Sequence, residues 1–261
     1  MYTSKGRWGG RLTSRPLPEG DKEIDRLSDT QRGELALVWL GRAASERRVA
    51  DAFEVIHEAL QELGSDAELC ALAARAVDDE HRHAELSRLV ATHFAGRELD
   101  PPARLTLVVP EHPGAAPKLL STLRVLGHCA MNETFASVFL EASLDLARGA
   151  FARAAVRELL SDEIDHARIG WAHLAELSAA DRAELAPWLP SMVRANLKMW
   201  RDSPRPYPVD PMLHRHGAPP AHAVEQALLS AIRELIIPGL ERFGLSTSTL
   251  ATWLAEEAPT Y

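Results

Sequence analysis

The string Asp-Glu-x-x-His occurs twice in this chain, at residues 79–83 and at residues 162–166. Both copies lie in Ala- and Leu-rich segments that are typical of long helices. On an α-helix, positions i and i+3 share one face, so a Glu and a His at that spacing can bind one metal ion together. Two such half-sites on facing helices, completed by single Glu residues from two more helices, form a two-metal site inside a bundle. The repeated string therefore predicts that these two helices meet at a shared metal centre.

A further Glu-x-x-His string at residues 54–57 shows that counting motifs is not enough. A chain with eleven His residues is expected to contain about one such string by chance. The distance of each motif from the nearest turn is more informative. Glu163 follows the turn at residues 148–149 by about as many residues as Glu133 precedes it. Antiparallel helices place such residues at the same height, so Glu133 is predicted to join the second half-site.

The first helix should supply the remaining carboxylate. The candidates on it are Glu46, Glu54 and Glu58. Glu46 falls on the apolar stripe of this helix, at heptad steps from its large apolar residues. Glu54 falls on another face and stands about five residues nearer the turn than Glu80, an axial offset of roughly 7 to 8 Å. We therefore predict Glu46 as the ligand and interpret the third string as a chance match.

Composition excludes several classes of protein. With 261 residues, 46% of them hydrophobic, the chain can bury a large core, and one domain with appendages is the simplest organisation. A net charge of −8 argues against a nucleic-acid partner. No apolar run suits a signal peptide or a membrane span, so we expect a cytoplasmic location and no membrane partner. Cys70 and Cys129 fall on helical patterns, which argues against a disulfide framework.

The chain is expected to have three parts. Residues 1–27, rich in Gly, Pro and Arg, should form a flexible or surface-wrapping N-terminal arm. Residues 28–178 hold the expected helices, at about 28–63, 65–95, 118–147 and 150–177. The proline-rich stretch 96–117 cannot be helical throughout, and it is long enough to return along the bundle. Residues 179–261 should form a helical extension that packs on the bundle.

The predicted metal ligands are Glu46, Glu80, His83, Glu133, Glu163 and His166. Together they resemble the ligand set of the ferritin-like di-iron carboxylate superfamily, in its oxidase and oxygenase branch. The first string also resembles the Asp-Glu-x-Arg-His string of bacterial multicomponent monooxygenases. The resemblance covers about residues 28–177. It implies an all-α fold: a ferritin-like four-helix bundle with a long crossover between helices 2 and 3, followed by additional C-terminal helices.

The resemblance also assigns roles to residues around the ligands. In that superfamily the Asp before a ligating Glu typically binds the outer nitrogen of a ligating His, a role that would fall to Asp79 and Asp162. Ser137 stands where oxygen-activating members often place a hydroxyl group, which makes it a catalytic candidate. His128, five residues before Glu133, is expected to point away from the ligand face.

The chemistry that the resemblance implies is O2 activation by two Fe ions, with Mn/Fe and Mn/Mn pairs as alternatives. Such an enzyme would oxidise a small organic substrate and would draw on an external electron donor, and it could form a homodimer. Two other function classes stay open. One is iron storage or peroxide detoxification of the ferritin kind, and the other is a helical protein with a structural or inactive metal site. The long C-terminal segment favours the enzyme, because storage subunits are little more than the bundle.

Some branches of the superfamily fit less well. A ribonucleotide reductase small subunit is disfavoured because none of the tyrosines, Tyr2, Tyr207 and Tyr261, falls on a bundle helix. Arylamine N-oxygenases carry an additional His one turn before the last Glu, where this chain has Leu159. Transfer-RNA hydroxylases and aldehyde-deformylating enzymes stay open.

Overall fold

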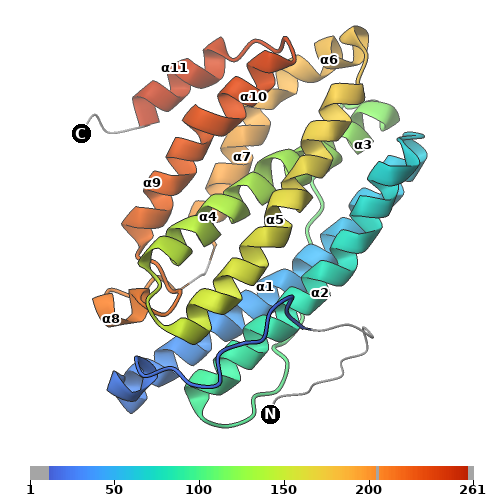
Figure 1. Cartoon of the computed structure of the whole chain (residues 1–261). Coiled ribbons are helices and arrows are strands. Elements are labelled where there is room, and N and C mark those ends of the chain that lie inside the picture. The colour runs from blue at the N-terminus through green and yellow to red at the C-terminus, as the bar shows by residue number, and fades with distance from the viewer. Residues whose placement is uncertain (1–11, 204–205, 258–261) are drawn as a thin grey trace.

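Residues 12–203 and 206–257 are described by the structure, a computed structural model (Figure 1). They are helical throughout their regular parts and contain no strand, which confirms the predicted all-α class. A short 3-10 helix (Ile24–Arg26) comes first, followed by α1 (Asp29–Glu62), α2 (Ala67–Ala95), α3 (Pro117–Val125), a π-helix (Leu126–Asn132), α4 (Glu133–Leu146) and α5 (Ala150–Glu176). No helix among the described residues is long and apolar enough to cross a membrane.

The start and the buried face of α1 follow from its sequence. Ser28 caps the helix by accepting from the backbone N–H of Gln31, whose side chain accepts from the Ser28 backbone in return. The predicted apolar stripe is buried: Trp39, Ala43, Ala50, Phe53 and Leu60 are all inaccessible to solvent. Burial of a complete stripe over this length means that α1 packs along the full height of the bundle.

The stretch between α2 and α3 is a long crossover without helix or strand. Arg47 of α1 donates a hydrogen bond to the Pro102 carbonyl, and Arg104 forms an ion pair with Asp51. The crossover thus passes the middle of α1. At its end, Ser121 of α3 donates to Glu62 at the last turn of α1, at 3.2 Å. Segment 117–146 therefore runs antiparallel to α1, and so parallel to α2, as the length of the crossover predicts.

The third long helix is not continuous, in contrast to the single helix expected for residues 118–147. Residues 126–132 form a π-helix, in which hydrogen bonds close from residue i to i+5. Here α5 approaches closely: a Cβ on Gly170 would lie 2.3 Å from the backbone nitrogen of Ala130. Only glycine fits that contact. The wider turn changes which residues share a face, and this matters at the site described below.

Along each long helix, the buried residues change from apolar to polar and back to apolar. One apolar cluster includes Phe53, Ala76 and Ile169, and the larger one includes Leu86 and Leu159. Between them the same helices carry the buried polar side chains Glu80, His83, Glu133, Glu163 and His166. The bundle thus encloses a polar layer between two apolar layers, and that layer is shielded from bulk water.

The C-terminal part adds shorter helices to the side of α4 (Figure 1). They are α6 (Ala179–Leu185), α7 (Leu189–Arg201), α8 (Pro211–His214), α9 (Ala221–Ala231), α10 (Ile237–Arg242) and α11 (Ser248–Glu257). The helix expected over residues 221–243 is interrupted by a π-helix, Ile232–Ile236, which ends two residues before Pro238. Proline removes one backbone donor and clashes with the preceding turn, and a π-helix is one way to accommodate it.

The described part of the N-terminal arm lies against the bundle. Ile24 and Leu27 are buried in the larger apolar cluster. The Asp21 carboxylate accepts from the Phe151 backbone N–H at the start of α5, and Ser14 donates to Glu158 in the same helix. Residues 12–27 thus wrap over α5, while residues 1–11 of the expected arm lie outside the described residues.

Candidate metal centre

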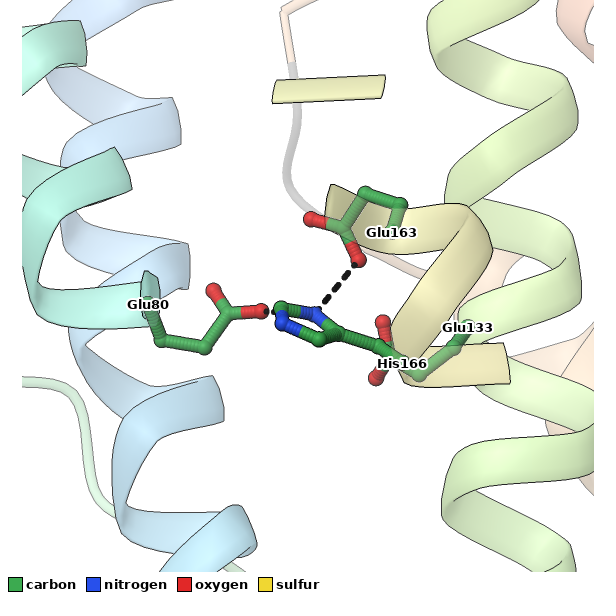
Figure 2. A group of neighbouring side chains, drawn as sticks. All are labelled: Glu80, Glu133, Glu163 and His166. Carbon is green, nitrogen blue, oxygen red and sulfur yellow. Dashed lines mark hydrogen bonds and ion pairs between the residues drawn. The ribbon is translucent and has the colours of Figure 1, made fainter. Parts of the chain in front are cut away.

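Four buried side chains from three helices converge in the polar layer (Figure 2). They are Glu80 of α2, Glu133 of α4, and Glu163 and His166 of α5. One ligand atom from each lies within 4.8 Å of those of the others. Carboxylate oxygens and an imidazole nitrogen are suitable ligands for Fe, Mn and Zn. This group can therefore hold a metal ion.

His83 lies beside this group and makes the same kind of contacts with Glu80 and Glu163 as His166 does. Its Nδ1 lies 3.4 Å from Glu163 Oε1 and 3.6 Å from Glu80 Oε2. The Nδ1 of His166 lies 3.3 Å from Glu163 Oε2 and 3.0 Å from Glu80 Oε1. Each of the two carboxylates thus presents one oxygen to each histidine. Glu80 and Glu163 therefore lie between the two histidines, with one oxygen directed at each ring.

The outer nitrogens of both histidines face an aspartate from the opposite helix. His83 Nε2 lies 3.0 Å from Asp162 Oδ2, and His166 Nε2 lies 3.6 Å from Asp79 Oδ2. An aspartate facing Nε2 favours a proton on that nitrogen, so a metal ion that replaced the proton on Nδ1 would find the tautomer that it requires. Each aspartate thus faces the histidine of the other helix; the contact of Asp162 with His83 is a hydrogen bond, and that of Asp79 with His166 is a longer charge contact.

Arg82, one position before His83, connects the two aspartates. Its guanidinium forms ion pairs with Asp162, with Asp79 at 3.4 Å and with Glu158 at 3.4 Å. The same guanidinium donates to the Leu12 carbonyl, which joins the N-terminal arm to the site. Arg82 therefore neutralises both aspartates and fixes their positions. Nothing in the sequence alone indicated that one arginine would serve both histidine–aspartate pairs.

Glu46 of α1 lies near the same layer, whereas Glu54 does not. Glu46 lines a cavity together with Glu133 and Glu163, and its charge interacts with Glu80, Glu163 and His83. Glu54 is exposed to solvent, and His57 is hydrogen-bonded to Gln61 on the surface of α1. The structure thus places Glu46 in the cavity wall beside Glu133 and Glu163, outside the group of four, and leaves the third Glu-x-x-His string on the surface.

The charge balance of the layer favours a bound cation. Both oxygens of Glu80 and the Nδ1 of His83 are buried and have no hydrogen-bond partner within the described residues. Burial, together with the charges of Glu80 and Glu163, raises the pKa of Glu46 to about 8. Burial also raises the pKa of Glu163, but contacts with His166 and His83 outweigh it and hold that pKa well below its usual range. Buried carboxylates that repel one another are costly, and a bound cation at this point would reduce that repulsion.

His128 is placed differently from the sequence-based expectation. Its Nε2 lies 3.1 Å from Glu133 Oε1, on the ligand face and not away from it. The π-helix explains the difference, because the Glu133 N–H bonds to the His128 carbonyl and so stacks residues i and i+5. Burial lowers the pKa of His128 to about 4, so this imidazole is neutral at physiological pH.

A cavity of about 250 Å³ opens beside the carboxylates. Its wall includes Glu46, Glu133 and Glu163 at one end and Ala136, Trp200 and Tyr207 farther out. The segment that closes it is tied to α1: Trp39 Nε1 donates to the His216 carbonyl, and Arg42 Nη2 donates to the Gly217 carbonyl, both at 3.0 Å. Gly217 has a φ of 79° and a Cβ there would meet the Trp39 ring at 2.8 Å, so both backbone and contact require glycine.

The surroundings of Glu133 include residues that sequence reasoning missed. Asn132 Nδ2 donates to Glu133 Oε1, and Trp200 Nε1 of α7 donates to Asn132 Oδ1, both at 2.9 Å. Ser137 is half-buried on α4; its Oγ has no hydrogen-bond partner within the described residues, and it is not part of the cavity wall. Tyr207 reaches the cavity from a linker, which helix periodicity could not have indicated.

The metal-free protein is expected to lose stability as pH rises from 6.5 to 8. The pKa of Glu46 is raised from 4.5 to about 8, and those of His83 and His166 are raised above 6.5 because contacts with carboxylates outweigh burial. All three groups bind protons more tightly in the folded state than in the unfolded state. Stability therefore falls as pH rises through this window. Thermal unfolding in the presence of a chelator at the two pH values measures the effect.

In that experiment Glu46→Gln serves as the control. This substitution removes one of the titrating groups, so the thermal unfolding temperature of the variant should depend less steeply on pH between 6.5 and 8. The lowered pKa values of His128 and His173, both about 4, act only below pH 6.5 and do not disturb the comparison. An unfolding temperature that rises from pH 6.5 to 8 would show that folding does not raise the pKa values of these groups.

Comparisons with family models, with curated proteins and with solved structures gave no match for this chain.

Proposed function

We propose that the chain is a ferritin-like oxidoreductase that uses a pair of metal ions to activate O2 and oxidise a small organic molecule. The observation that supports this most is the crossed arrangement of the two half-sites. Each oxygen of Glu80 and of Glu163 faces a different histidine, at 3.0 to 3.6 Å. A purely structural site for one ion needs neither two bridging carboxylates nor a second imidazole.

The proposed ligands can be assigned to two metal positions. His83 and Glu46 would complete one metal position, and His166 and Glu133 the other, with Glu80 and Glu163 shared. When bound, a pair of Fe(II) ions would supply the electrons that reduce O2, and an external donor would restore them. Mn/Fe and Mn/Mn pairs suit the same oxygen-rich ligands. Asp79 and Asp162 keep the outer nitrogens of the imidazoles protonated and so fix their orientation.

The protein around the site suits a small substrate. A cavity of about 250 Å³ is near the lower end of ordinary ligand pockets. It reaches Glu133 and Glu163 from the side of α7 and the linker, so an organic molecule can lie against the carboxylate side of the site. Apolar layers above and below the ligands keep water away from the reacting groups.

The direct test is O2 consumption by the iron-loaded protein with a chemical reductant. We expect consumption that depends on iron and that is absent from Glu163→Ala, measured with an oxygen electrode. A panel of small phenols and carboxylic acids should contain compounds that increase the rate or become oxidised. If the wild-type protein consumes no more O2 than Glu163→Ala does, the assignment as an O2-activating enzyme is wrong.

Filling the cavity is expected to separate substrate oxidation from metal binding. Ala136 lies one turn after Glu133 and lines the cavity, so Ala136→Phe would occupy the space that a substrate needs. We expect oxidation of any active panel compound to fall ~10-fold or more, as for a misplaced reactant, with unchanged metal content. Val138→Phe on the same helix, outside the cavity wall, is the matched control. Equal losses in both variants would argue against substrate binding in this cavity.

A further inference from the structure

The π-helix Leu126–Asn132 gives the site an imidazole beyond the two of the repeated string. Its hydrogen bonds stack residues i and i+5, and so place His128 over Glu133. In a regular α-helix, five residues correspond to a rotation of about 500°, which would direct the two side chains to different faces. The π-helix is therefore the structural reason that His128 faces the site.

The distance between the two side chains is that of neighbouring ligands on one metal ion. His128 Nε2 lies 3.1 Å from Glu133 Oε1. Ligand atoms at bond lengths of about 2.1 Å and at right angles around one ion are roughly 3 Å apart. The second copy of the repeated string shows a similar spacing, with 3.3 Å between His166 Nδ1 and Glu163 Oε2.

The contact between His128 and Glu133 is not a hydrogen bond. Within the described residues, His128 Nε2 is buried and has no hydrogen-bond partner, although the carboxylate oxygen is so close. Glu133 Oε1 instead accepts from Asn132 Nδ2 at 2.9 Å. The two atoms thus approach each other without sharing a proton, as ligand atoms do when both are directed at a third centre.

The ring of Phe53 packs against both His128 and His166. Phe53 lies edge-on to His128 at 4.8 Å between ring centroids, and it lies 5.0 Å from the ring of His166. Both imidazoles therefore flank the same phenyl ring at the level of Glu133. His128 is not among the residues that line the cavity, so it approaches Glu133 from another side than a substrate would.

From these contacts we infer that His128 is an additional ligand of the metal ion held by Glu133 and His166. This inference rests on the proposed two-metal site and extends it. The two positions are then unequal: the Glu133 position has two imidazoles, and the Glu46 position has one. The added imidazole occupies a coordination position away from the cavity, which leaves the cavity side of that ion for small molecules.

Co(II) is a suitable probe, because it binds where Fe(II) and Mn(II) bind and its visible absorption reports the ligands. We would titrate three metal-free proteins with Co(II) under anaerobic conditions: wild type, His128→Ala and His128→Gln. The measured quantities are the affinity for each Co(II) ion and the visible absorption of the bound Co(II). His173→Ala is the matched control, because His173 is a buried histidine whose ring nitrogens, like His128 Nε2, have no hydrogen-bond partner within the described residues. Circular dichroism of each metal-free variant verifies its folding.

In the His128 variants we expect one Co(II) ion to bind as in wild type and the other ~10-fold or more weakly, with altered absorption. Added imidazole should restore part of the affinity in His128→Ala but should have no effect on His173→Ala. Unchanged affinity and absorption in both His128 variants would overturn the inference and leave the proposed function intact. If wild type itself binds no Co(II), the two-metal site and this inference both fail.

Discussion

Glu163→Ala is expected to remove both metal ions and with them all O2 consumption. The two oxygens of Glu163 face different histidines, with Oε1 at 3.4 Å from His83 Nδ1 and Oε2 at 3.3 Å from His166 Nδ1. Removing this carboxylate takes one ligand from each ion. It also leaves two buried imidazoles without the charge that orients them, which is among the more damaging changes a buried polar network can suffer. Metal analysis of the purified, iron-loaded variant measures the loss.

Single histidine variants should have a smaller effect than Glu163→Ala. His83→Ala and His166→Ala each remove the imidazole of one position, so at least one ion should be lost from each variant. Glu54→Ala is the control, because Glu54 is an exposed glutamate on α1 that belongs to the third Glu-x-x-His string. Retention of both ions by Glu163→Ala would mean that the carboxylate does not bridge. Loss of metal from Glu54→Ala would mean that the site lies elsewhere.

Much of the fold is predictable from the sequence because it depends on local rules. The capping residue Ser28, the apolar stripe of α1 and the turns near Gly64 and Gly149 define long helices and their lengths. Equal distances from those turns then place Glu80, Glu133 and Glu163 at one height, and the structure brings these three together. The site could be approached from sequence because its ligands obey helix spacing.

The role of His128 could not be predicted from helix spacing. A regular α-helix through residues 118–147 would direct His128 away from Glu133, whereas the π-helix brings the two side chains together. No simple residue pattern predicts a π-helix. The available signal was indirect: Gly127 and Gly170 mark places where neighbouring helices come close, and Gly170 faces the π-helix. Glycine inside a helix pattern indicates close packing, although it does not say how the helix adjusts.

The cavity wall was also beyond sequence reasoning. Trp200 and Tyr207 reach the cavity from α7 and from a proline-rich linker, whose path is fixed by long-range contacts with Trp39 and Arg42 of α1. Helix periodicity describes contacts between neighbouring turns and facing helices. It contains no information on where a linker without regular structure will lie, so the general expectation of a covering C-terminal extension could not be refined to particular residues.

Anaerobic titration with Fe(II), followed by exposure to O2, tests the central claim most directly. An O2-activating enzyme keeps its ions, so binding should saturate at about two Fe(II) per chain, and O2 should oxidise that pair. Further iron added in air should precipitate. A storage protein would instead pass oxidised iron into a cage and accumulate many more ions per chain in soluble form, as part of a large hollow assembly. Saturation at about two ions with oxidation by O2 is the result that the account predicts; soluble loading far beyond that number, or no binding at all, would contradict it.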